Sequence, residues 1–209
     1  MNKETDPVYS RQVVEFVAVA TEFCKYAEHA SEIKGEDMIR IMQRILPLLY
    51  LKASLIPEFK PYFEDGNEKF VNESDWNIIH DSFKRKLGSA NDYLDISDEK
   101  TNEPGSTVVS SLAENFADIY QDLKDFILLY QTGTGEVMND ALWDCRENFE
   151  NIWGQKIVNA LKAIHKYIYS GENLNDPSEV DKDESADNTD KSEWFISKRQ
   201  KEYRKDEDE

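Results

Sequence analysis

The chain has 209 residues, enough for one ordinary domain with extra segments and for a core that needs neither disulfides nor metal. Its 43 acidic residues outnumber the 25 basic ones, and the net charge of -18 opposes binding to nucleic-acid backbones and to anionic membrane surfaces. This charge keeps a protein soluble, and it also suits basic partners or bound cations. Only 8 glycines and 6 prolines occur, which favours long helices joined by few connections.

The sequence carries no sign of a redox site, a secretion signal or a membrane span. Cys24 and Cys145 lie inside apolar helical patterns and outside any CxxC or Cys/His cluster, so we expect buried free thiols. The amino terminus lacks the apolar stretch and cleavage site of a signal peptide. The longest apolar stretch, residues 45–51, is about a third of a membrane span. We therefore expect a cytoplasmic protein.

Two amphipathic helices are predicted at the start of the chain. The first begins with Asp6 as N-cap and Pro7 at its first position, and it ends at Gly35. The second covers about residues 36–56, and its wide apolar face predicts that it is the central element of the bundle. Pro47 lies inside this helix, so we expect a kink or a break there, because proline removes one backbone hydrogen bond.

A polar stretch separates these helices from a third, which we expect to begin at Ser74 and to end at Gly88. Residues 89–105 are predicted to form a loop of about seventeen residues, a length typical of functional or mobile loops. Ser106 is expected to begin a fourth helix, and a fifth covers about residues 136–169.

A bend is expected in the fifth helix at Gly154. Together the elements predict an all-α protein, a single bundle of about five helices over residues 7–171.

Residues 172–209 differ from the rest in composition, with 14 acidic and 7 basic side chains, and predict an acidic, largely disordered tail. Its segment 193–205, EWFISKRQKEYRK, places aromatic residues before a basic stretch. We expect Trp194, Phe195 and Arg199 to bind a hydrophobic groove, either on the body of this protein or on another chain.

Three segments of the helical region carry a resemblance. ILPLLYLKASLIP (45–57), ENFADIYQDLKDF (114–126) and WGQKIVNALKAIH (153–165), in this order, resemble a bacterial, all-helical family known as a domain of unknown function. The resemblance covers most of residues 8–170 and implies an all-helical, intracellular protein. It supplies no catalytic motif.

Two rows of carboxylates are candidate metal ligands. Glu114, Asp118 and Asp122 are four residues apart on the predicted fourth helix, and Asp140 and Asp144 form a comparable row on the fifth. Several hard oxygen ligands that converge would hold Mg or Mn for a hydrolase of a phosphorylated small molecule. The other interpretation is that each row is a solvated or ion-paired face, and the Glu-x-x-His pairs of di-iron bundles are absent.

No nucleophile motif or phosphate-binding loop accompanies these carboxylates. We therefore interpret the protein as a non-catalytic, intracellular protein-binding or adaptor module that needs no cofactor. We expect a protein partner or a homo-oligomer, and neither nucleic acid nor a membrane as partner. The alternative is the metal-dependent hydrolase, which requires at least three of the five carboxylates to converge on one concave site.

Overall fold

The computed structural model describes residues 6–63, 66–96 and 105–170. The α-helices are α1 (Arg11–Glu28), α2 (Gly35–Ala53), α3 (Glu73–Leu87), α4 (Leu112–Tyr130), α5 (Gly135–Asn148) and α6 (Gly154–Ser170). Short 3-10 turns cover Pro7–Tyr9, Ala30–Glu32 and Gly88–Ala90, a π-helical turn covers Phe149–Trp153, and β1 (Asp92–Ile96) pairs antiparallel with β2 (Thr107–Ser111). The all-α class with about five helices is confirmed, since α5, the π turn and α6 form one continuous helical run.

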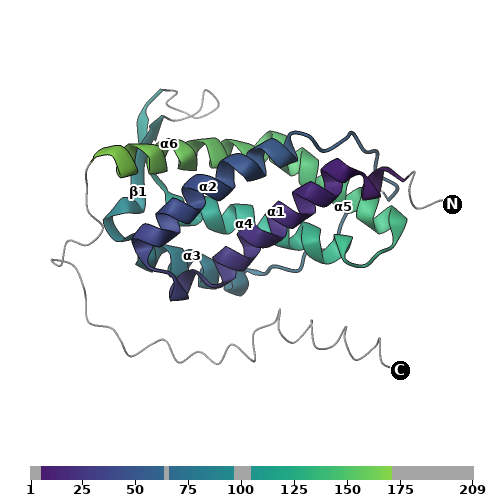
Figure 1. Cartoon of the computed structure of the whole chain (residues 1–209), viewed down its shortest axis with the longest axis horizontal. Helices are drawn as coiled ribbons and strands as arrows, with labels where there is room; N and C mark the ends of the chain where they lie inside the picture. The colour runs from purple at the N-terminus through teal and green to yellow at the C-terminus, as the bar shows by residue number, and fades with distance from the viewer. Residues whose placement is uncertain (1–5, 64–65, 97–104, 171–209) are drawn as a thin grey trace. The chain divides into compact units, whose positions relative to one another are not determined.

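The central helix is α4, not α2. Thirteen of its nineteen residues are buried, and it packs against α1, α3, α5 and α6. Aromatic contacts hold it, with Phe116 4.9 Å from Phe83 and Phe126 5.3 Å from Phe16 between ring centroids. Figure 1 shows α1 and α2 side by side in front of α4, with α6 along one side of α2. The prediction that the second helix is the central element is therefore wrong.

The boundaries of the first two helices differ from the prediction. Asp6 does act as an N-cap, but Pro7 begins a 3-10 turn, and α1 starts at Arg11. The helix α1 ends at Glu28 and not at Gly35 as predicted. Gly35 is instead the first residue of α2. The helix α2 continues through Pro47 without a break. Pro47 is exposed, so the backbone hydrogen bond that proline removes lies on the side of the helix that faces solvent.

The helix α3 begins one residue before the predicted Ser74, with Asn72 as its N-cap. The Asn72 side chain accepts from the backbone N–H of Ser74 and of Asp75, while the Asp75 carboxylate accepts from the Asn72 N–H. This reciprocal capping box satisfies three backbone donors at the start of the helix. Gly88 ends it, as predicted, in a conformation with a φ of 49° that favours glycine.

The region predicted as a long loop holds the first strand of a β-hairpin, and the predicted start of the fourth helix holds the second. Its strands run Asp92–Ile96 and Thr107–Ser111, so the fourth helix begins at Leu112 with Ser111 as N-cap, and the predicted start at Ser106 is wrong. Three of the five β2 residues, in the sequence TVVSS, are β-branched, which favours an extended chain over a helix.

The bend predicted at Gly154 takes the form of a π-helical turn. The Gly154 N–H donates to the Phe149 carbonyl, five residues earlier. A Cβ atom on Gly154 would lie 2.4 Å from that carbonyl oxygen, so only glycine allows the chain to close this turn. Throughout the described part of the chain, no helix has both the length and the apolar character of a membrane span.

Candidate functional site

The first carboxylate row is used for contacts between helices. Asp118 on α4 accepts a 2.7 Å hydrogen bond from Trp76 Nε1 on α3 and forms a 2.6 Å ion pair with Lys156 Nζ on α6. Glu114, one turn earlier, is exposed in the first turn of α4. Asp118 therefore joins three helices through its own two oxygens, and Glu114 is a solvated residue near the positive end of the α4 dipole.

Asp122 and Asp144 interact with each other and with the same lysine. Lys69 Nζ forms a 2.9 Å ion pair with Asp144, and its charge partly offsets the rise that burial causes in the pKa of Asp122 and of Asp125. Asp122 also accepts a 3.0 Å hydrogen bond from Asn148 Nδ2. Burial raises the pKa of Asp122 to about 6, against the influence of Lys69 and with a further rise from Asp125 and Asp144. An ammonium group thus supplies the positive charge that a metal ion would bring.

Asp140 is not among the charges that act on Lys69 or Asp122, and it binds main-chain amides. Its Oδ1 accepts from the Tyr62 N–H at 2.7 Å, and its Oδ2 accepts from the Phe63 N–H at 2.8 Å. Asn139 donates to the Lys60 carbonyl at 2.7 Å, and Asn67 donates to the Asp140 carbonyl at 2.9 Å. The loop between α2 and α3 is therefore fastened to the start of α5, with the Tyr62 and Phe63 side chains exposed.

Asp125 does the same for the end of this loop, because it accepts from the N–H groups of Phe70 and Val71 at 2.8 and 2.9 Å. Neither loop contact was predicted, since nothing in the local sequence marks a backbone N–H as the partner of a distant carboxylate. Within residues 6–63, 66–96 and 105–170, no three His, Cys, Asp or Glu side chains are grouped so that they could hold a metal ion. The condition set for the hydrolase interpretation is thus not met among the described residues.

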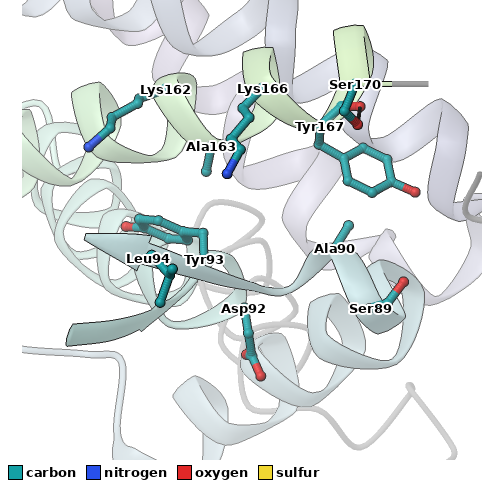
Figure 2. A pocket seen from close by; sticks show the side chains of 10 residues that line it. All are labelled: Ser89, Ala90, Asp92, Tyr93, Leu94, Lys162, Ala163, Lys166, Tyr167 and Ser170. Atoms are coloured by element: carbon teal, nitrogen blue, oxygen red, sulfur yellow. Dashed lines mark hydrogen bonds between the residues drawn. The ribbon is translucent and has the colours of Figure 1, made fainter. Parts of the chain in front are cut away.

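A cavity of about 240 Å³ opens between β1 and α6 (Figure 2). Lys162 and Lys166 project from α6 toward β1, above the Tyr93 ring, while the Asp92 side chain points away from α6. Lys162 forms a 3.4 Å ion pair with Asp95, and Lys166 forms no ion pair with the described residues. The volume is below the usual range for small-molecule sites.

A larger apolar depression, the α1–α2 groove, has a volume of about 520 Å³. It is lined from α1 by Ala18, Val19, Glu22 and Tyr26, and from α2 by Ile41, Arg44, Ile45 and Leu48. Leu48 is 43% exposed, Leu51 one turn later on α2 is 51% exposed, and Leu55, just after the end of α2, is 48% exposed. A row of leucines that faces solvent on a helix is unusual unless something else covers it.

The aromatic-basic segment 193–205, including Trp194, Phe195 and Arg199, lies outside the described residues, as does the whole predicted tail.

Comparison with known proteins finds a family model and a solved structure that are similar to the helical region. The family described as "Domain of unknown function (DUF5063)" matches residues 7–170. The crystal structure of protein BF1032 from Bacteroides fragilis is 37% identical in sequence, superposes with a TM-score of 0.72, and covers 80% of this chain and 98% of its own. No curated protein matches the chain.

Proposed function

We propose that this chain, which belongs to the DUF5063 family, is a non-catalytic, cytoplasmic protein-binding module that holds an amphipathic helix in its α1–α2 groove. The observation that carries the proposal is the open, mostly apolar lining of this groove. Helix-in-groove binding needs a depression of this kind, because the bound helix inserts its apolar side chains into it. The exposed side chain of Leu48 would then be covered on binding.

The charges of the groove indicate the kind of helix that fits. Glu22 lines it from α1 and Arg44 lines it from α2, so the walls carry one charge of each sign. A helix with apolar anchors and flanking charges of both signs suits these walls, since each rim charge then meets an opposite one. Buried anchors contribute most of the affinity, and the rim pairs contribute to orientation.

The occupant to which we commit is the chain's own segment 193–205. It offers Trp194 and Phe195 as anchors, and its charges include both Arg199 and Glu202. The 22 residues 171–192 that precede it reach up to about 70 Å when extended, whereas the 19 residues of α2 measure about 28 Å. The tether therefore allows the segment to reach the groove and keeps it at high effective concentration. A protein partner with similar anchors would act by displacing it.

The test uses a fluorescent peptide with the sequence of residues 193–205, titrated with three forms of the full chain. Wild type should bind it weakly, because the tethered copy competes. The double variant Trp194→Ala, Phe195→Ala should bind it at least about tenfold more tightly, since this competition is lost. Adding Leu48→Glu should abolish binding, because a charge would enter the apolar wall.

The matched control is Ile78→Glu, which places the same charge at a similarly exposed isoleucine on α3, outside the groove. It should leave peptide binding unchanged. Thermal unfolding followed by circular dichroism checks that each variant is folded. Equal binding by wild type and the double variant, or binding that survives Leu48→Glu, would contradict the proposal.

A further inference from the structure

The β-ribbon formed by β1 and β2 exposes apolar side chains on one face. Leu94 and Val109 are direct cross-strand partners and are 63% and 71% exposed. Ile96, two residues along β1 on the same face, is 65% exposed. In Figure 1 the ribbon projects beyond α6, away from the helices. A two-stranded hairpin of this kind is marginally stable by itself, and a further strand or a packing surface normally completes it.

The two edges of the ribbon differ. The β1 side faces α6 across the cavity lined by Tyr93, Lys162 and Lys166 (Figure 2). The β2 edge carries the sequence TVVSS, without a charge, a proline or a glycine. Exposed edge strands are usually protected from pairing by lysines, prolines, bulges or covering segments. An uncharged, β-branched edge is what a strand needs if it is to accept another strand.

The ladder pattern shows which main-chain groups this edge offers. The Leu112 N–H donates to the Asn91 carbonyl at 2.8 Å, so these two residues form a hydrogen-bonded pair next to the ribbon. Hydrogen-bonded and non-hydrogen-bonded pairs alternate along an antiparallel ladder. The pair of Leu94 with Val109 is therefore non-hydrogen-bonded, and the N–H and C=O groups of Val109 point away from β1. They are placed to bond to an added strand.

We propose that β2 pairs antiparallel with β2 of a second copy of this chain, which gives a four-stranded sheet in the order β1, β2, β2, β1. A two-fold axis brings the same strand against itself, and this is favourable only where like residues do not repel. The sequence TVVSS meets that condition, whereas a basic or acidic partner strand would find no opposite charge on β2. A sheet of four strands is also more stable than the two-stranded ribbon, which is only marginally stable by itself.

The net charge of -18 on each copy opposes the pairing at long range. Salt screens charges beyond the Debye length, about 8 Å at physiological ionic strength, but leaves main-chain and apolar contacts in place. Added salt should therefore raise the fraction of dimer, which is the opposite of its effect on an interface built from ion pairs.

Sedimentation velocity of the full chain tests the proposal. As its concentration rises, wild type should change from the 24.3 kDa monomer to a dimer of twice that mass. The fraction of dimer should be larger at high salt. Val109→Pro should remain a monomer, because it removes an N–H of the free edge while β1–β2 hydrogen bonds are kept. Val109→Lys, which adds an edge charge, should also remain a monomer. The matched control Val158→Lys, at an exposed position of α6, should dimerise as wild type does.

Two further variants separate this inference from the proposed function. Leu48→Glu and the double variant Trp194→Ala, Phe195→Ala should still dimerise, since neither alters β2. A wild type that stays monomeric at every concentration and salt, a dimer that survives both Val109 substitutions, or one lost in the double variant would overturn the inference. Unchanged thermal unfolding of the two Val109 variants shows that the helical body remains folded.

Discussion

The Oδ1 atom of Asp140 accepts a 2.7 Å hydrogen bond from the backbone N–H of Tyr62, a residue 78 positions earlier in the chain. The carboxylate is buried and the Tyr62 side chain is exposed. An internal charge is thus satisfied by the main chain of a surface loop, and the same contact fixes the direction of that loop. Asp140 is a structural anchor in this arrangement, and its substitution has a measurable consequence.

Asp140→Ala should lower the free energy of unfolding by about 2 kcal/mol, because it leaves the Tyr62 and Phe63 N–H groups without their acceptor. Asp140→Asn keeps one acceptor oxygen and should lose less. Urea unfolding measures both, and chymotrypsin should cleave after Tyr62 faster in the alanine variant. Asp81→Ala, at an exposed carboxylate, is the control. A loss of Mg binding in calorimetry, with stability unchanged, would instead favour the hydrolase interpretation.

Asp122→Asn should stabilise the protein near neutral pH. Burial raises the pKa of Asp122 from 3.8 to about 6, so the folded state holds this proton more tightly than the unfolded state does. The contribution to stability is then full below about pH 4 and is lost as the pH rises through 6. The asparagine variant should gain on the order of 2 kcal/mol near pH 7 and nothing near pH 4.

The measurement is urea unfolding at both pH values. Asp144→Asn is the contrasting variant, since it breaks the 2.9 Å ion pair with Lys69 and should not stabilise the fold. An Asp122→Asn variant with the pH profile of wild type would show that Asp122 has an ordinary pKa in the folded protein.

Gly154→Ala distinguishes the π-helical turn from a regular helix. Helix propensity alone predicts a gain of about 1 kcal/mol when glycine is replaced by alanine. The added Cβ atom would lie 2.4 Å from the Phe149 carbonyl oxygen, so we expect a loss of about 1–3 kcal/mol instead. Thermal unfolding gives the sign. Gln155→Ala, at the neighbouring exposed position, should have little effect.

Pro47→Ala should stabilise α2 by about 1–3 kcal/mol, because it restores a backbone donor inside the helix and removes the clash of the proline ring with the preceding turn. The residue is exposed, so the change leaves no cavity. The control is Pro61→Ala in the loop before α3, which should cost up to about 1 kcal/mol through the greater freedom of the unfolded chain. Chemical denaturation compares the two, and a destabilised Pro47→Ala variant would contradict this reasoning.

Most helices were predictable because a buried face repeats with the period of the helix. The α4 residues Phe116, Leu123 and Phe126 mark such a face in sequence and are buried in the structure. The central position of α4 was not predictable, since an apolar stripe does not show whether the other sides are covered too. In α2 the stripe is as wide, but part of it, including Leu48, faces solvent.

The hairpin and the partners of the carboxylates depend on contacts between residues that are distant in sequence. Leu94 and Val109 pair across a connection, and both remain exposed, so the apolar residues of these strands do not mark a buried face. The spacing of Asp118 and Asp122 placed both on one side of α4, as predicted. Their partners Trp76, Lys156 and Asn148 belong to other helices, and one sequence does not reveal which side chains meet there.

The contact of Trp76, Asp118 and Lys156 gives the molecule an intrinsic optical reporter. A displacement of α6 would move the Lys156 ammonium, change the field at Asp118 and alter the hydrogen bond to the Trp76 indole. Indole emission depends on such nearby charges, so Trp76 on α3 would register changes at α6 through Asp118 on α4. One wall of the cavity between α6 and β1 belongs to the helix that carries Lys156, so we expect binding there to change the Trp76 emission.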